Sequence, residues 1–215
     1  MTNLTAQTKL GLIGSNGKMG QAILQATDPQ SIVKVDRNTN LESYIEKADV
    51  WMDFSLNELA IKHINLCQKY NKPILIGTTG EITKLDFQPT CPVMFAPNCS
   101  ITWNLIRKLL KNLTGHQLII TDTHNHTKLD TPSGTTKDIV AFMPQVVGIH
   151  SIRNNINGAK MQLSLFNFEE IIDISYQALG RDSYAKGAIF ASIWLAKQPA
   201  GLYSMESCIQ ELLDC

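Results

Sequence analysis

The sequence has few cysteines, and none of them stands in a CxxC pair. The five that it has, Cys67, Cys91, Cys99, Cys208 and Cys215, are odd in number and widely spaced. This distribution argues against a disulfide framework and against a zinc site, both of which need paired or regularly spaced cysteines. We therefore expect reduced thiols and no bound metal.

The chain also lacks an excess of charge of either sign. Nineteen Lys and Arg residues balance nineteen Asp and Glu residues over 215 positions. Proteins that bind nucleic acids or anionic membranes usually carry a basic surplus that meets phosphate groups, so the balance argues against both partners. We expect a small-molecule partner instead.

No apolar run approaches the roughly 20 residues that a membrane-spanning helix needs. The first nine residues are polar and do not show the basic-then-apolar order of a secretion signal. With 44% hydrophobic and 18% charged residues, the composition is that of an ordinary globular protein. The sequence thus predicts a cytoplasmic protein that does not enter membranes.

Short apolar strands alternate with helix-forming segments in the first half of the chain. The expected strands are 10–13, 32–35, 50–54, 73–76 and 93–96, and the expected helices are 21–27 and 59–70. This order is typical of an α/β fold with a Rossmann-like, doubly wound parallel sheet, in which ligands bind at the carboxyl ends of the strands.

The pattern changes in the second half. Residues 161–166 and 170–175 alternate apolar and polar side chains, as antiparallel strands with one covered face do. A strand is expected over 117–121 and helices over 101–113, 136–142, 184–197 and 205–213. We predict a dinucleotide-binding domain of residues 1–98 and 181–215, with an inserted α+β domain, containing a mixed or antiparallel sheet, over 99–180.

A glycine turn connects the first expected strand to a helix. Gly14 allows a tight turn, Gly17 lets the backbone approach a ligand, and Gly20 allows the helix to pack against the sheet. A purely structural turn is the alternative, but free amides at a helix start favour phosphate. The residues expected to bind the cofactor here are Gly14, Ser15, Asn16, Gly17, Lys18 and Met19.

Polar residues also follow the next strands. Asp36 can accept from the ribose hydroxyls of NAD, whereas Arg37 can pair with the 2′-phosphate of NADP, so NADH and NADPH both remain open. The other strand ends are ambiguous one by one, but in a parallel sheet they converge on one crevice. These further candidates for cofactor binding are Asp53, Phe54, Gly77, Thr78, Thr79, Ala96, Pro97, Asn98 and Cys99.

The segment from Thr123 to Thr135 carries the groups suited to proton transfer. His124 and His126 point to opposite faces if the chain is extended, which argues against a shared metal ion. Lys128 can supply charge to a carboxylate or a proton to a reacting nitrogen. Residues 133–135, Ser-Gly-Thr, precede an expected helix whose first amides favour anions. The segment predicts a proton donor beside a carboxylate site.

Together these motifs resemble the dihydrodipicolinate reductase (4-hydroxy-tetrahydrodipicolinate reductase) family along nearly the whole chain. The matching positions are Gly14, Gly17, Met19, Gly20, Asp36, Arg37, Gly77 to Gly80, Asn98 to Ser100, Asp122, His124, Lys128, Asp130, Pro132 to Thr135, Arg181, Tyr184 to Ala188 and Gly201 to Met205. The resemblance implies an NAD(P)H-dependent oxidoreductase of lysine and diaminopimelate biosynthesis that forms a homotetramer, with residues 99–180 as the substrate-binding and oligomerisation domain. It also implies catalytic roles for His124 and Lys128, and substrate binding by Asn125, Lys128, Ser133, Gly134 and Thr135.

Three positions depart from the family pattern. Asn125, Lys160 and Tyr176 stand where the family commonly has histidine. We expect weaker or altered substrate binding with retained chemistry. Two alternatives stay open: a non-catalytic dinucleotide-binding homologue, and a reductase of a different cyclic imine acid.

Overall fold

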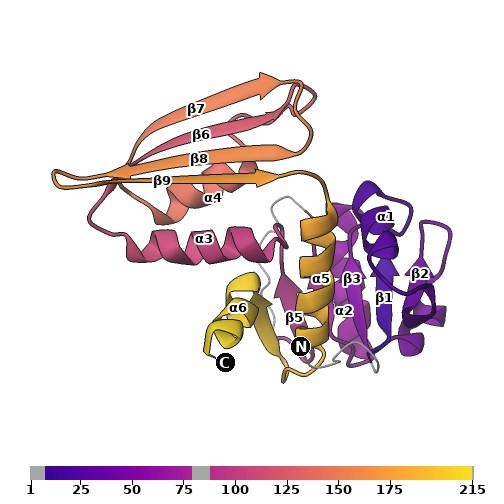
Figure 1. The fold of residues 1–215 in the computed structure, drawn as a ribbon. Coiled ribbons are helices and arrows are strands. Elements are labelled where there is room, and N and C mark those ends of the chain that lie inside the picture. Colours follow the sequence, from indigo (N-terminus) through magenta and orange to yellow (C-terminus); the bar gives the residue numbers. More distant parts are fainter. Residues whose placement is uncertain (1–7, 79–87, 215) are drawn as a thin grey trace. The chain divides into compact units, whose positions relative to one another are not determined.

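The computed structural model describes residues 8–78 and 88–214. The chain forms two compact units, one of Met1–Ile101 with Asp182–Cys215 and the other of Thr102–Arg181 (Figure 1). None of the helices within the described ranges is both long and apolar enough to cross a membrane.

The first unit is built on a six-stranded sheet with the order β10-β5-β4-β3-β1-β2, in which all neighbours run parallel. Its strands are β1 (Leu10–Ile13), β2 (Ile32–Val35), β3 (Val50–Asp53), β4 (Ile74–Ile76), β5 (Pro92–Phe95) and β10 (Gly201–Ser204). The predicted Rossmann-like parallel sheet is therefore confirmed.

Helices cover both faces of this sheet. Ile64 of α2 (Ala60–Lys69) packs with Trp51 and Ile74 in one buried cluster. The helices α1 (Lys18–Gln25) and α5 (Asp182–Leu195) contact each other, and α5 also contacts β3 and β4. Because side chains alternate along a strand, Leu75 faces away from the α2 side. The remaining helical elements are η1 (Pro29–Ser31), η2 (Leu41–Ser43), η3 (Ile45–Lys47), η4 (Asn57–Leu59) and α6 (Met205–Asp214).

The second unit contains a mixed four-stranded sheet with the order β7-β6-β8-β9. Strand β6 (Gln117–Asn125) pairs parallel with β7 (Val146–Asn154) and antiparallel with β8 (Ala159–Phe166), which pairs antiparallel with β9 (Ile171–Ala178). The helices α3 (Ile101–Asn112) and α4 (Gly134–Phe142) lie on one face of this sheet (Figure 1). Trp103, Leu110 and Ile139 bury their side chains there against Leu118 and Ile120.

Some boundaries differ from the sequence prediction. Strand β6 continues to Asn125, four residues beyond the predicted end, because it pairs with strands on both sides as far as that region. The segment from Thr123 is therefore a strand where it begins and becomes a turn only at His126. Helix α1 begins at Lys18 and α4 at Gly134, each earlier than expected, because the helical turns start directly after Gly17 and Ser133.

Two strands were not predicted. Both are edge strands, β7 in the second sheet and β10 in the first. Strand β7 has half-buried or exposed residues throughout, and β10 has only four residues, so neither shows a clear apolar alternation. Residues 199–201 lie between α5 and α6, and Gly201 already pairs with Pro92 as the first residue of β10.

Candidate functional site

The carboxyl ends of five neighbouring parallel strands meet along one edge of the first sheet. The residues that follow these ends are the ones predicted to bind a cofactor: Gly14 to Met19 after β1, Asp36 and Arg37 after β2, Asp53 and Phe54 at β3, Gly77 and Thr78 after β4, and Ala96 to Cys99 after β5. Thr79 lies outside the described residues. The fold thus brings these candidates together at the edge where doubly wound sheets bind ligands.

The glycine turn brings the start of α1 close to the end of β1. Gly14 has φ +83°, a conformation that favours glycine. A Cβ on Gly20 would lie 2.3 Å from the carbonyl oxygen of Gly14, so only glycine lets α1 start this close to β1. Gly17 is the N-cap of α1, and no side chain among the described residues caps the helix there. The first amides of α1 can therefore donate to a pyrophosphate, and the turn fits a dinucleotide.

Asp36 presents an ionised carboxylate beside this turn. Its oxygens accept from the hydroxyl of Thr39 at 2.8 Å, the amide of Asn38 at 2.9 Å and the side-chain amide of Asn16 at 3.4 Å. The Thr39 and Asn38 hydrogen bonds hold the pKa of Asp36 below its usual value. Arg37 is exposed next to it. An anionic acceptor and an exposed cation thus adjoin at the end of β2.

Asp53 and Cys99 are among the predicted cofactor residues whose side chains are buried. The Asp53 carboxylate is fully buried, accepts from the Ser55 hydroxyl at 2.6 Å, and lies 2.7 Å from Nδ1 of His63 on α2. The thiol of Cys99 donates to the carbonyl of Ala96 at 3.2 Å, and burial raises its pKa to about 12. Asp53 therefore ties β3 to α2, and the backbone of Cys99 is its most available part for a ligand.

His124 lies near the carboxyl end of β6 in the second unit. Its Nε2 atom is buried and has no hydrogen-bond partner among the described residues. Burial, followed by the positive charges of Lys128 and Arg153, lowers the pKa of His124 below its usual value, although Asp122 opposes them. The imidazole is therefore held in its neutral form and can accept a proton or relay one.

Lys128 follows in the turn between β6 and α4. Its ammonium lies 2.7 Å from Oδ1 of Asp130, and this ion pair lowers the pKa of the Asp130 carboxyl. Asn125 shapes the turn from the end of β6: its side-chain amide donates to the carbonyl of Ile156 at 3.2 Å, and its side-chain oxygen accepts from the amide of Thr127 at 3.1 Å. Both ends of the Asn125 side chain are therefore engaged within the protein.

The Ser-Gly-Thr segment forms the N-terminus of α4. Ser133 is the N-cap, and its hydroxyl oxygen accepts from the amide of Thr136 at 3.2 Å. A Cβ placed on Gly134 would meet no atom within 4 Å, so the described surroundings leave open space beside this residue. Thr135 is partly exposed on the same turn. A carboxylate can approach this positive helix end.

The sequence reasoning did not assign Asp122 and Arg153 to the site. Asp122 is fully buried and accepts from the amide of Ser133 at 2.9 Å and the hydroxyl of Thr136 at 2.7 Å. Arg153 donates to its other oxygen at 3.1 Å. Although burial opposes ionisation, these hydrogen bonds hold the pKa of Asp122 well below its usual range. Arg153 is the only Asp, Glu, Lys or Arg in β7, a signal that could have found it.

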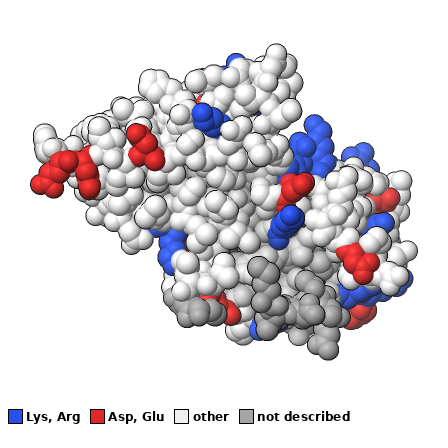
Figure 2. Space-filling model, viewed as in Figure 1, with Lys and Arg blue, Asp and Glu red and all other residues white. Residues whose placement is uncertain are grey.

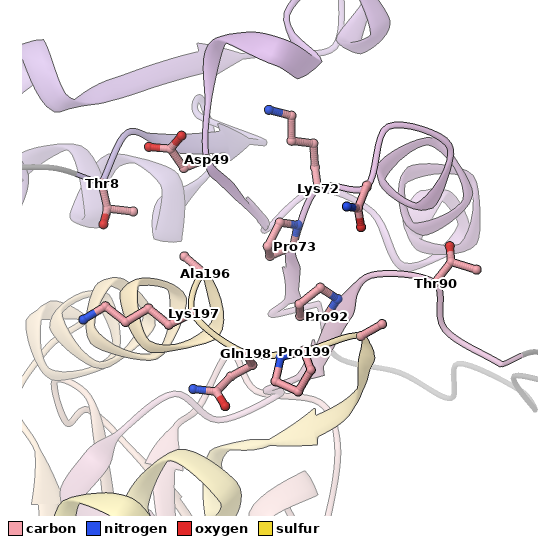
Figure 3. A pocket seen from close by; sticks show the side chains of 12 residues that line it. Thr8, Asp49, Lys72, Pro73, Thr90, Pro92, Ala196, Lys197, Gln198 and Pro199 are labelled. Carbon is pink, nitrogen blue, oxygen red and sulfur yellow. The ribbon is translucent and has the colours of Figure 1, made fainter.

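A cavity of about 760 Å³ lies at the opposite edge of the first sheet (Figure 3). It adjoins the amino-terminal ends of β3, β4, β5 and β10, whereas the glycine turn lies at the carboxyl end of β1. Of its charged lining residues, Lys72 pairs with Glu46 at 2.8 Å and Asp49 accepts from the backbone amide of Lys9 at 2.7 Å. This cavity is therefore separate from the candidate dinucleotide site.

Basic and acidic side chains are interspersed on the face shown in Figure 2, and neither sign covers it. Within the described residues, no group of three or more His, Cys, Asp or Glu side chains is placed to hold a metal ion.

Comparisons with known proteins match most of the chain to dihydrodipicolinate reductases. A family profile described as "Dihydrodipicolinate reductase, N-terminus" matches residues 8–99, and one described as "Dihydrodipicolinate reductase, C-terminus" matches residues 99–209. A relative from Rickettsia rickettsii named 4-hydroxy-tetrahydrodipicolinate reductase is 33% identical over 92% of this chain and 97% of its own. One of the same name from Buchnera aphidicola is 25% identical, over 96% and 98%.

A solved structure, the dipicolinate-bound dihydrodipicolinate reductase from Paenisporosarcina sp. TG-14, matches with a TM-score of 0.79 at 21% identity, covering 93% of this chain and 98% of that one. This likeness supports the fold.

Proposed function

Because the chain belongs to the dihydrodipicolinate reductase family, we propose that it reduces 4-hydroxy-tetrahydrodipicolinate to tetrahydrodipicolinate with NADH or NADPH, in lysine and diaminopimelate biosynthesis. The observation that carries the proposal is the arrangement of the β6–α4 segment. It holds a neutral imidazole at His124, an ammonium at Lys128 and an open helix N-terminus at Gly134 within one stretch of chain.

The first unit supplies the groups for the dinucleotide. The uncapped start of α1 accounts for pyrophosphate binding, and Asp36 for the adenosine ribose. When bound, the nicotinamide supplies a hydride. The exposed Arg37 favours the 2′-phosphate of NADPH, whereas the Asp36 carboxylate favours the ribose hydroxyls of NADH, so we expect both cofactors to be used.

The second unit supplies binding and proton transfer for the cyclic dicarboxylate. The reaction adds one hydride and one proton to the substrate, and the 4-hydroxyl group leaves as water. Amides of Gly134 and Thr135 hold a substrate carboxylate at the start of α4, and the Lys128 ammonium adds charge attraction. His124 and Lys128 handle the proton, an assistance that typically contributes about 10² to 10⁴ in rate.

Asn125 supports a second candidate, a reductase of a different cyclic imine acid. The Asn125 side chain is engaged with Ile156 and Thr127. It is therefore not free to contact a substrate in the way expected of the histidine that the family commonly has at this position. A panel of cyclic imine acids, each tested with the same enzyme and cofactor, separates this candidate from the first.

The assembly that we propose is a cytoplasmic homotetramer. The sheet of the second unit carries α3 and α4 on one face, and its other face exposes apolar side chains, including Ile152 at 45% and Ile171 at 71%. Burying this face between copies removes apolar surface from water. Sedimentation equilibrium measures the assembly, and a monomer at micromolar concentration contradicts it.

The direct test of activity is a coupled assay. Dihydrodipicolinate synthase, pyruvate and aspartate semialdehyde generate the substrate, and absorbance reports the oxidation of NADH or NADPH. We expect turnover by the unmodified chain and little by the His124→Ala, Lys128→Ala double variant. Equal rates for the two proteins overturn the proposed function.

A further inference from the structure

We propose that Arg153 is the positioning residue of the substrate segment: it fixes the turn that carries Lys128 and the helix start that carries Gly134. The proposal rests on the proposed function, because that function gives the segment its substrate. Arg153 hydrogen-bonds to the backbone carbonyl of Lys128. The proposed function assigns proton transfer to the Lys128 ammonium, which is a different group.

The guanidinium of Arg153 reaches the turn at three places. Nε donates to the carbonyl of Lys128 at 3.3 Å, and Nη2 donates to the carbonyl of Asp130 at 2.6 Å and to the hydroxyl of Thr131 at 3.2 Å. These acceptors lie more than 20 residues earlier in the sequence. The planar guanidinium offers five N–H groups in fixed directions, which lets one side chain hold several backbone oxygens together.

The same guanidinium fixes the start of α4 through Asp122. Nη1 of Arg153 donates to one carboxylate oxygen of Asp122, and the other oxygen accepts from the amide of Ser133 and the hydroxyl of Thr136. Ser133 and Thr136 flank the two residues, Gly134 and Thr135, that the proposed function assigns to the carboxylate. The position of the helix start thus depends on a carboxylate that Arg153 holds in place.

Burial makes the loss of either partner of the Arg153–Asp122 pair costly. The Asp122 side chain is fully buried and that of Arg153 is 18% exposed. Removing one partner of a buried pair leaves the other charge without compensation. The pair therefore holds the substrate segment in one arrangement before the substrate arrives, which reduces the ordering that binding requires.

The test compares Arg153→Gln and Arg153→Lys with Arg107→Gln as the matched control. Arg107 lies in the same unit and makes a two-point pair with Asp138, at 2.6 Å and 3.0 Å, on the helical side of the sheet. Steady-state kinetics with the coupled substrate supply separate KM values for substrate and for cofactor, together with kcat.

We expect Arg153→Gln to lower kcat/KM for the substrate by on the order of 10²-fold, the usual effect of a misplaced catalytic group. The KM for the cofactor stays unchanged, because its binding residues belong to the other unit. Arg153→Lys keeps the charge but not the fork, so it restores only part of the activity. Wild-type kinetics in Arg153→Gln, or an equal loss in Arg107→Gln, overturn the proposal.

A second measurement, the pKa of His124, reports the effect of the positive charge of Arg153. The groups that act on His124 are Lys128, Asp122, Arg153 and Asp130. Removal of the Arg153 charge raises the pKa of His124 in an NMR titration, whereas Arg153→Lys leaves it near the wild-type value. A purely structural role does not separate these two variants, so equal titration curves for both contradict the proposal.

Failure of the proposed function and failure of the Arg153 proposal give different results. If the unmodified chain shows no turnover, the proposed function fails, and the NMR titration still decides whether Arg153 acts on the segment. If Arg153→Gln does not fold, Thr131→Val removes a single hydrogen bond without leaving a buried charge. That variant then lowers kcat/KM severalfold, and an unchanged value overturns the proposal.

Discussion

His124 and Arg153 occupy paired positions on the neighbouring parallel strands β6 and β7. The pairing places a guanidinium beside an imidazole that is already half-buried, and Lys128 adds a second positive charge. Burial is the main cause that lowers the pKa of His124 and favours its unprotonated form, and the charges of Lys128 and Arg153 add to it. The register of this strand pair thus supplies one part of the electrostatics of the candidate site.

The Lys128→Gln variant should raise the pKa of His124 toward its ordinary value of 6.5, because one of the charges that lower it is gone. NMR titration of the imidazole measures the shift. Since the folded pKa is depressed, His124 contributes stability above pH 6.5, and this contribution is lost as the pH falls through the folded pKa. A pKa at or above 6.5 in the unmodified chain contradicts the account.

The Asp130→Asn variant should bind pyridine-2,6-dicarboxylate more tightly, because Lys128 no longer has an internal carboxylate at 2.7 Å. Partly exposed ion pairs contribute ~0.4–1 kcal/mol, so we expect a gain of about two- to fivefold in affinity by calorimetry. Asp173→Asn is the control, since Asp173 accepts from Ser164 elsewhere in the same sheet. Unchanged or weaker binding by Asp130→Asn argues that the ion pair does not compete with the substrate.

Alanine at Gly17 and at Gly20, two of the three glycines of the α1 turn, should have different consequences. In Gly17→Ala the Cβ lies 3.3 Å from the carbonyl oxygen of Gly14, a tight contact that a small shift relieves, and the methyl group occupies the approach of a phosphate. We expect at least a tenfold weaker Kd for NADH, or ~1.4 kcal/mol, with a smaller loss of Tm than in Gly20→Ala. Gly20→Ala meets backbone at 2.3 Å and should lower the Tm. The reverse pattern would show that Gly17 has only a structural role.

Single substitutions at the end of β2 should separate the two cofactors. Asp36→Ala removes the acceptor for the ribose hydroxyls and raises the KM for NADH, whereas Arg37→Ala removes the cation and raises the KM for NADPH. A severalfold change in KM is expected for each exposed interaction. Equal effects of both variants on both cofactors would mean that neither residue contacts the adenosine ribose.

Much of the fold follows from local patterns. The strands β1 to β5 are short, mainly apolar runs; the first four end at or directly before glycine or aspartate, and β5 ends shortly before Pro97, so the strand ends are visible in the sequence. Strand β7 was missed because, as an edge strand, it has no fully buried side. The cofactor candidates could be predicted because they follow predicted strands.

The Arg153–Asp122 pair could not be predicted in the same way. Its partners are 31 residues apart and meet only because β6 and β7 pair in parallel across α4. Local periodicity carries no information about that register. The contact between the Asp53 carboxylate and His63 could not be predicted for a similar reason, since His63 lies on the helix that follows the strand.

The most direct measurement is transfer of deuterium from cofactor to product. With NADH or NADPH that carries deuterium at both C4 positions of the nicotinamide, the tetrahydrodipicolinate formed in the coupled reaction should gain one deuterium per cofactor oxidised, as mass spectrometry detects. The His124→Ala, Lys128→Ala double variant should form little labelled product. Tight binding of the cofactor without any labelled product, under conditions where an authentic reductase gives it, would contradict the account and identify a non-catalytic homologue.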